Sequence, residues 1–193
     1  MTPTLIAVAV LLALWLISVY NFFVSSKARI KASIQEIGNQ LKRQADLIPN
    51  LESSVKGYLK HEKGIFEQLT DARRAVSQAA KSGNLQKMAD ASSKISQLLP
   101  TLSIAVEDNP ELKGSEVVGR LMDELRDTAD KVMYARRLVI DLTADFNVRR
   151  VTFPSSLVAG VFNFKELPGL ITPETGEHMG VSKDETKTPK VSL

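Results

Sequence analysis

The feature that most limits the fold is an uncharged run of twenty residues near the start of the chain. Leu5 to Val24 (LIAVAVLLALWLISVYNFFV) contains no Asp, Glu, Lys or Arg. A helix rises about 1.5 Å per residue, so this run is about 30 Å long, the thickness of the hydrocarbon core of a bilayer. Trp15 and Tyr20 are of the kind enriched at membrane surfaces. We therefore expect residues 1–25 to form a transmembrane anchor.

A secretory signal peptide is the alternative for this run. Such a peptide needs a basic segment in front, a shorter apolar core and a small-residue cleavage site. No Lys or Arg precedes Leu5, and residues 18–22 (SVYNF) contain no A-x-A pattern. The sequence therefore favours a retained anchor.

The distribution of charge predicts the orientation of the anchor. Lys27, Arg29 and Lys31 follow the apolar run directly. The positive-inside rule then places the body in the cytoplasm and the amino terminus outside, in a single-pass protein of the cell membrane. The net charge is only +3, and acidic residues are interspersed with the basic ones, so a nucleic-acid-binding surface is not expected.

The periodicity of the remaining chain is helical throughout. Apolar residues recur every three or four positions in four stretches, approximately 30–59, 65–79, 85–106 and 117–146. The first and last stretches lie in segments 26–61 and 115–150, each about 36 residues or about 55 Å of helix. Pro49 is expected to kink the first helix without ending it. No stretch alternates as a strand would.

This pattern predicts an all-α fold, in which the transmembrane helix continues into an antiparallel up-down four-helix bundle. The bundle, residues 26–151, would have two long and two short helices with coiled-coil-like packing. Residues 152–171 form a short apolar segment, and residues 172–193 are polar and expected to be disordered. The chain contains no cysteine, which excludes a disulfide framework.

Charged residues on the apolar sides of the helices suggest ion pairs inside the bundle. On a helical wheel Arg73 and Arg136 point toward apolar sectors, and Glu52 and Glu62 lie near the apolar stripe of the first helix. A buried charge needs a partner, so we expect the arginines to pair with the carboxylates. The alternative is that these long side chains extend outward between helices.

The opposite face of the first helix is polar and is the predicted partner face. It consists of Asn39, Arg43, Asp46, Asn50, Gly57 and His61. A glycine within a helix costs about 1 kcal/mol relative to alanine, so Gly57 suggests a close approach of another backbone. The face is expected to bind a protein partner or a second copy. The alternative is that another helix of the same chain covers it.

The end of the fourth helix should return to the membrane. Aromatic and basic residues gather there, as is typical of a segment that lies at a membrane surface and contacts lipid. The predicted membrane-surface residues are Lys27, Arg29, Lys31, Arg149, Arg150, Phe153, Phe162 and Phe164. The alternative is that segment 152–171 caps the open end of the bundle.

Motifs for catalysis or metal binding are not found. His61-Glu62 begins like H-E-x-x-H, but residue 65 is Ile and the other histidine is His178. The sequence contains no glycine-rich phosphate loop and no G-x-S-x-G. We therefore expect no metal, no cofactor, no small-molecule substrate and no enzymatic activity.

Several short motifs resemble those of the LemA family. They are Tyr20-Asn21, RQADLIPNL at 43–51, VKGY at 55–58, His61-Glu62, Ala72-Arg73, NPELK at 109–113, YARR at 134–137, Phe153-Pro154 and AGVFNF at 159–164. The resemblance implies a single-span membrane protein with a helical-bundle body, in a family without an established biochemical role. The chain departs from the family at Leu138-Val139 and Phe146-Asn147, where Tyr-Asn is usual, so roles of those tyrosines do not carry over.

Together these features predict a membrane-anchored scaffold or adaptor that acts through protein–protein contacts or self-association. The alternative function is an accessory subunit of a membrane enzyme, such as a protease.

Overall fold

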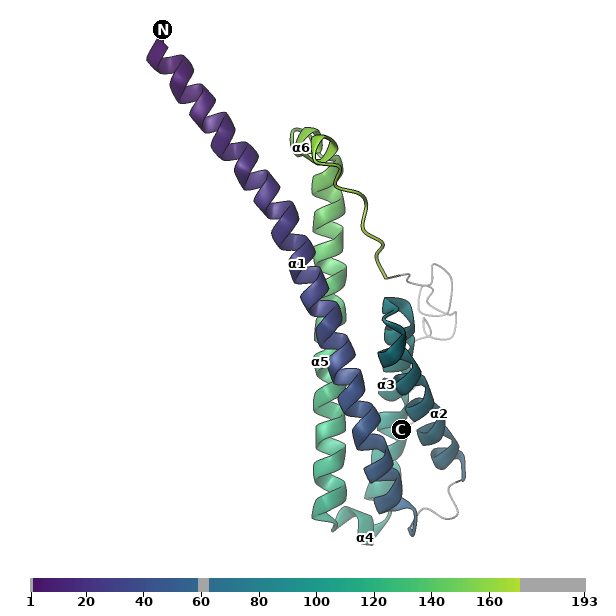
Figure 1. Cartoon of the computed structure of the whole chain (residues 1–193). Helices are drawn as coiled ribbons and strands as arrows, with labels where there is room; N and C mark the ends of the chain where they lie inside the picture. Colours follow the sequence, from purple (N-terminus) through teal and green to yellow (C-terminus); the bar gives the residue numbers. More distant parts are fainter. Residues whose placement is uncertain (1, 59–62, 171–193) are drawn as a thin grey trace, which may run out of the picture.

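The computed structural model describes residues 2–58 and 63–170, and these residues form helices and connecting turns without a strand. The predicted tail, 172–193, and His61 and Glu62 lie outside the described residues. The helices are α1 (Thr2–Val55), α2 (Lys63–Ser82), α3 (Leu85–Glu107), α4 (Pro110–Lys113), α5 (Glu116–Val151) and α6 (Ser155–Val161) (Figure 1). The predicted all-helical class is confirmed.

Helix α1 joins the apolar run to the body without a break. It has 54 residues, continues through Pro49 and is about 80 Å long. Its amino-terminal end projects beyond the other helices (Figure 1), and only 6% of the most apolar stretch of 18 residues in α1 is buried. A core helix of a soluble protein would be mostly buried. By length and composition, α1 is therefore able to cross a membrane.

Capping side chains explain where α3, α4 and α5 begin. Asn84 accepts a hydrogen bond from the Lys87 N–H and starts α3, and Ser115 accepts one from the Val118 N–H and starts α5. The periodicity of the sequence did not predict α4, a single turn that Asn109 caps ahead of Pro110. The first helix was expected to reach His61, but α1 ends at Val55.

One hydrophobic core joins α1, α2, α3 and α5. Its fully buried members include Ile37 and Leu41 of α1, Val76 of α2, Ile95 of α3 and Leu125 of α5. Helix α1 packs mainly along α5, α2 packs against α1 and α3, and α3 packs against α5. This core explains why four helices with separate apolar stripes form one body.

The two long helices run in opposite directions and extend beyond α2 and α3 (Figure 1). Arg43 contacts Glu124, whereas Phe23 contacts Phe146, so residue numbers rise on one helix as they fall on the other. Beyond the start of α3 a second, smaller core forms between α1, α5 and α6, and we call it the junction core: Val19, Phe23, Phe146, Val158 and Ala159.

Candidate membrane-surface site

The end of α5 and helix α6 pack against the apolar half of α1. Phe23 is completely buried in the junction core, with the Phe146 ring edge-on at 5.2 Å and the Phe164 ring stacked at 4.7 Å between centroids. Because Val19 and Phe23 belong to the Leu5–Val24 run, the junction core lies beside its last two turns.

Hydrogen bonds and an ion pair hold the segment after α6 against α5. The Asn147 amide donates to the Leu167 carbonyl at 2.9 Å and accepts from the Leu167 N–H at 3.0 Å. The Arg150 guanidinium lies 2.7 Å from the Glu166 carboxylate. These contacts keep the Phe164 ring seated between Phe23 and α5.

The predicted membrane-surface aromatics divide into two kinds. Phe164 is half-buried and packs onto the junction core, as expected if the segment caps this end. Phe153 and Phe162 are 77% and 53% exposed, as are Leu157 and Val161 of α6. Helix α6 therefore has one face packed inward and one apolar face directed outward.

Basic side chains surround this end of the body. The Lys27 ammonium lies 5.2 Å from the centroid of Phe164 and 5.8 Å from that of Phe146. The Arg149 guanidinium lies 4.1 Å from the centroid of Phe22. Arg29 and Lys31 are exposed on the next turns of α1. Cations that lie over aromatic rings beside the last turns of the apolar run are suited to a membrane surface, where acyl chains and anionic headgroups meet.

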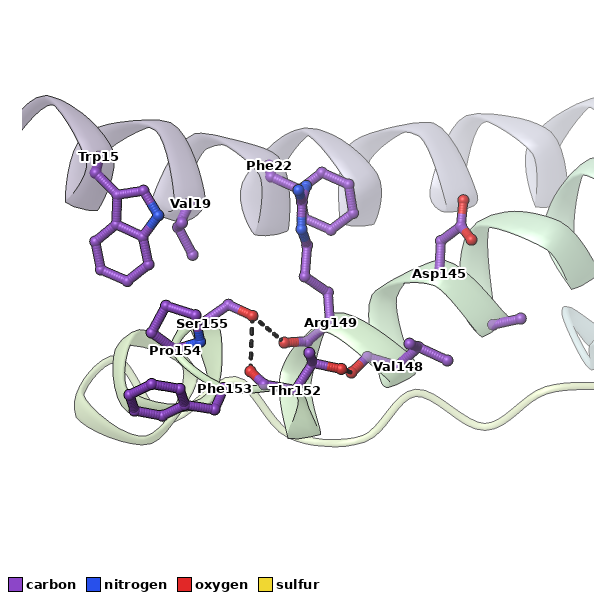
Figure 2. A pocket seen from close by; sticks show the side chains of 11 residues that line it. Trp15, Val19, Phe22, Asp145, Val148, Arg149, Thr152, Phe153, Pro154 and Ser155 are labelled. Carbon is purple, nitrogen blue, oxygen red and sulfur yellow. Dashed lines mark hydrogen bonds between the residues drawn. The ribbon is translucent and has the colours of Figure 1, made fainter.

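A pocket of about 550 Å³ opens between α1, the last turns of α5 and the turn into α6 (Figure 2). Trp15, Val19 and Phe22 line it from α1. The Ser155 hydroxyl lies 2.7 Å from the Arg149 carbonyl oxygen and 2.9 Å from that of Thr152 (Figure 2). These two contacts fix the turn that forms the pocket floor.

Of the expected ion pairs, Arg73 and Glu52 lie together at 3.4 Å. Their side chains are 45% and 27% exposed, so the pair lies at the edge of the α1–α2 contact and not inside the core. Arg136 is half-buried and contacts the Ser93 hydroxyl at 3.4 Å. Glu62 is outside the described residues, so its pairing remains a prediction.

The predicted partner face does not form one uniform surface. Arg43 is hydrogen-bonded and ion-paired to Glu124 of α5, and this carboxylate raises the pKa of Arg43 above its ordinary value. Asn39, Asp46 and Asn50 are exposed. His61, like Glu62, is not described.

The predicted position of Gly57 within the first helix is wrong. Gly57 lies in a turn after the end of α1 and not within a helix. A Cβ atom added to it would meet no described atom within 4 Å. The glycine therefore does not mark a close approach of another backbone among the described residues.

Two features of the structure were not predicted from the sequence. A second pocket, of about 600 Å³, lies between α1 and α5 and includes Tyr134 and Leu138. These apolar residues are four apart on α5 and exposed, a signal that the wheel could have given. The second feature is Gln44, which is completely buried in α1.

Among the described residues, no group of three or more His, Cys, Asp or Glu could hold a metal.

Comparison with models of protein families shows to which family the chain belongs. The model of the LemA family matches residues 33–183, most of the chain. The chain belongs to the LemA family. The LemA match begins after the apolar run and covers the helical body together with the junction segment. No curated protein matches this LemA-family chain.

Proposed function

We propose that this LemA-family protein is a single-pass membrane protein whose body acts as a scaffold or adaptor. The body would be an antiparallel four-helix bundle in the cytoplasm, without catalytic activity of its own. The observation that carries the proposal is the exposed apolar half of α1, which continues as one helix into the body. A partner bound to the body would thereby be held at a fixed distance from the bilayer.

Packing at the junction supports a retained anchor. Val19 and Phe23 lie within the apolar run and are buried against α5 and α6. Cleavage of the run as a signal peptide would remove these side chains from the junction core. Loss of a buried phenylalanine costs about 3–5 kcal/mol, so cleavage would destabilise the end of α5 and helix α6.

The arrangement of charge supports a cytoplasmic body. Arg149 and Arg150 in the last turn of α5 join Lys27, Arg29 and Lys31 at the same end of the body. Lys27, Arg29 and Lys31 follow the span directly and carry the bias that keeps this side in the cytoplasm. Arg149 and Arg150 add positive charge at the same end, which suits the anionic cytoplasmic surface.

Helix α6 is proposed to lie at the cytoplasmic membrane surface. It packs beside the last turns of the apolar run, and its outward face carries Leu157 and Val161. Such a face would be costly in water but favourable among acyl chains near the headgroups. The basic residues beside it would attract anionic lipids.

Partner binding is assigned to the exposed part of the predicted face, Asn39, Asp46 and Asn50. Photo-crosslinking residues should be placed at Asn39 and Asn50 of the full chain in membranes, followed by mass spectrometry. A discrete set of adducts, absent with the crosslinker at exposed Lys94 of α3, is expected. Adducts with the chain itself would indicate self-association.

The same experiment separates the two candidate functions. An adduct dominated by one membrane enzyme would favour the accessory-subunit alternative, which the exposed apolar face of α6 at the bilayer also suits. Equal labelling from Asn39, Asn50 and Lys94 would contradict a partner face on α1.

A further inference from the structure

The pocket at the junction combines an apolar wall with two charges of opposite sign. Trp15, Val19 and Phe22 form the wall, and Asp145 and Arg149 of α5 are also part of the lining (Figure 2). We propose that this pocket binds a phospholipid headgroup that carries both a phosphate and a primary ammonium, as in phosphatidylethanolamine. The inference rests on the proposed insertion of α1 in a membrane.

The depth of the pocket fits a lipid that stands in the cytoplasmic leaflet. Phe22 is two residues from Val24, the end of the apolar run, and Trp15 is nine residues from it. At about 1.5 Å per residue, the wall extends from about 3 Å to about 14 Å into the hydrocarbon core. The wall can therefore contact the upper part of an acyl chain while the α5 side chains face the headgroup.

Arg149 is the group suited to the phosphate. Its guanidinium lies over the Phe22 ring at 4.1 Å, which leaves its edge of N–H donors free. No carboxylate lies within ion-pair distance of it in the described ranges 2–58 and 63–170, whereas the neighbouring Arg150 is neutralised by Glu166 at 2.7 Å. A guanidinium binds a phosphate through two parallel hydrogen bonds.

Asp145 supplies the selectivity among headgroups. It is exposed and one helical turn before Arg149, so the two side chains share a face of α5 at about 5–6 Å between Cβ atoms. A purely anionic headgroup would meet repulsion from Asp145. An ammonium group beside the phosphate would donate hydrogen bonds to this carboxylate, which a choline cannot do because its nitrogen carries no hydrogen.

Trp15 provides a direct measurement because it is the single tryptophan of the chain and lines the pocket. The full chain is reconstituted in phosphatidylcholine bilayers that contain an equal, small fraction of a lipid with a brominated acyl chain. The brominated lipid carries an ethanolamine, choline or glycerol headgroup, and quenching of Trp15 fluorescence reports its occupancy of the pocket.

The expected result is strongest quenching by the ethanolamine lipid, with a relative affinity about tenfold above the choline lipid, the order of factor that one hydrogen bond to a charged group contributes. Asp145→Asn should abolish the preference for ethanolamine, and Arg149→Gln should weaken binding of this lipid further. Arg150→Gln, outside the pocket, should retain the preference, and circular dichroism checks that each variant is folded.

Equal quenching by all three lipids, preference for the glycerol lipid, or an unchanged preference in Asp145→Asn would overturn the inference. Failure of the proposed membrane anchor gives a different result. In that case Trp15 would be quenched by none of the brominated lipids, and its emission would remain that of an indole in water.

Discussion

At the scale of single residues, the polar side chains of the body differ in how well their hydrogen-bonding groups are satisfied. Gln44 is completely buried, and neither atom of its amide finds a hydrogen-bond partner among the described residues. A buried amide without a partner costs about 1–3 kcal/mol. The ion pair of Arg73 with Glu52, by contrast, is partly exposed and is worth less than about 1 kcal/mol.

Replacement of Gln44 by methionine should stabilise the body. Methionine has a similar shape and no hydrogen-bonding group to desolvate, so we expect the free energy of unfolding to rise by about 1 kcal/mol. Thermal unfolding of the full chain in detergent, followed by circular dichroism, measures the change. The control is Gln78→Met at an exposed position of α2, which should stay within about 0.5 kcal/mol of the native chain. A loss of stability in Gln44→Met would show that the amide is hydrogen-bonded.

At the scale of helices, α1 has two environments along one continuous axis. Its carboxyl-terminal half contributes Ile37, Leu41 and Ile48 to the main core, whereas Leu5 to Leu16 remain largely exposed. Between them, Val19 and Phe23 tie α1 to α5 and α6 through the junction core. Because the helix is unbroken, α6 is held at a fixed depth relative to the apolar run.

Removal of the Phe23 ring should release α6 without unfolding the main core. We expect Phe23→Ala to lose about 3–5 kcal/mol of local stability, because the ring is fully buried and contacts Phe146 and Phe164. Hydrogen exchange of the α6 backbone amides should accelerate accordingly, while exchange in α2 and α3 stays unchanged. Phe162→Ala, at a 53% exposed position, is the matched control and should change exchange in α6 little. Equal effects of the two substitutions would place the junction core elsewhere.

At the scale of the whole molecule, the described part of the chain is elongated, and its exposed apolar residues gather toward one end. The apolar half of α1 and helix α6 lie at one end, and α4 and the start of α5 lie at the other (Figure 1). For a body that lies in the cytoplasm, as proposed above, this separation predicts that access to water-soluble reagents increases from α6 toward α4.

Cysteine labelling measures that gradient, because the chain has no cysteine of its own. Val117→Cys lies at the far end of the body and Leu157→Cys on the outward face of α6, and both positions are 61% exposed. A membrane-impermeant thiol reagent should label Val117→Cys only when it reaches the cytoplasmic side, and it should label Leu157→Cys slowly until detergent is added. Rapid labelling of Val117→Cys in intact cells would reverse the proposed orientation.

Local physics was sufficient to predict much of the fold from the sequence. Twenty uncharged residues predict an apolar helix, and apolar residues that recur every three or four positions predict the other helical stretches. Ser115 marks the start of α5. Capping groups and hydrophobic periodicity act within a few residues, so they can be recognised in the chain alone. The family resemblance, confirmed over residues 33–183, rested on short sequence motifs, which can also be recognised in the chain alone.

Only the tertiary structure decided which side chains meet. Arg43 was assigned to the predicted partner face, with coverage by another helix of the chain as the alternative, and its partner Glu124 lies 81 residues away on α5. The wheel predicted that Arg73 and Arg136 pair with carboxylates inside the bundle. It could not show that the pair of Arg73 with Glu52 lies at a partly exposed edge, or that Arg136 contacts Ser93. The return of Phe164 onto Phe23 likewise depends on the lengths of α1 and α5 and on how they pack. Contacts between residues distant in sequence follow from this packing, which no local pattern encodes.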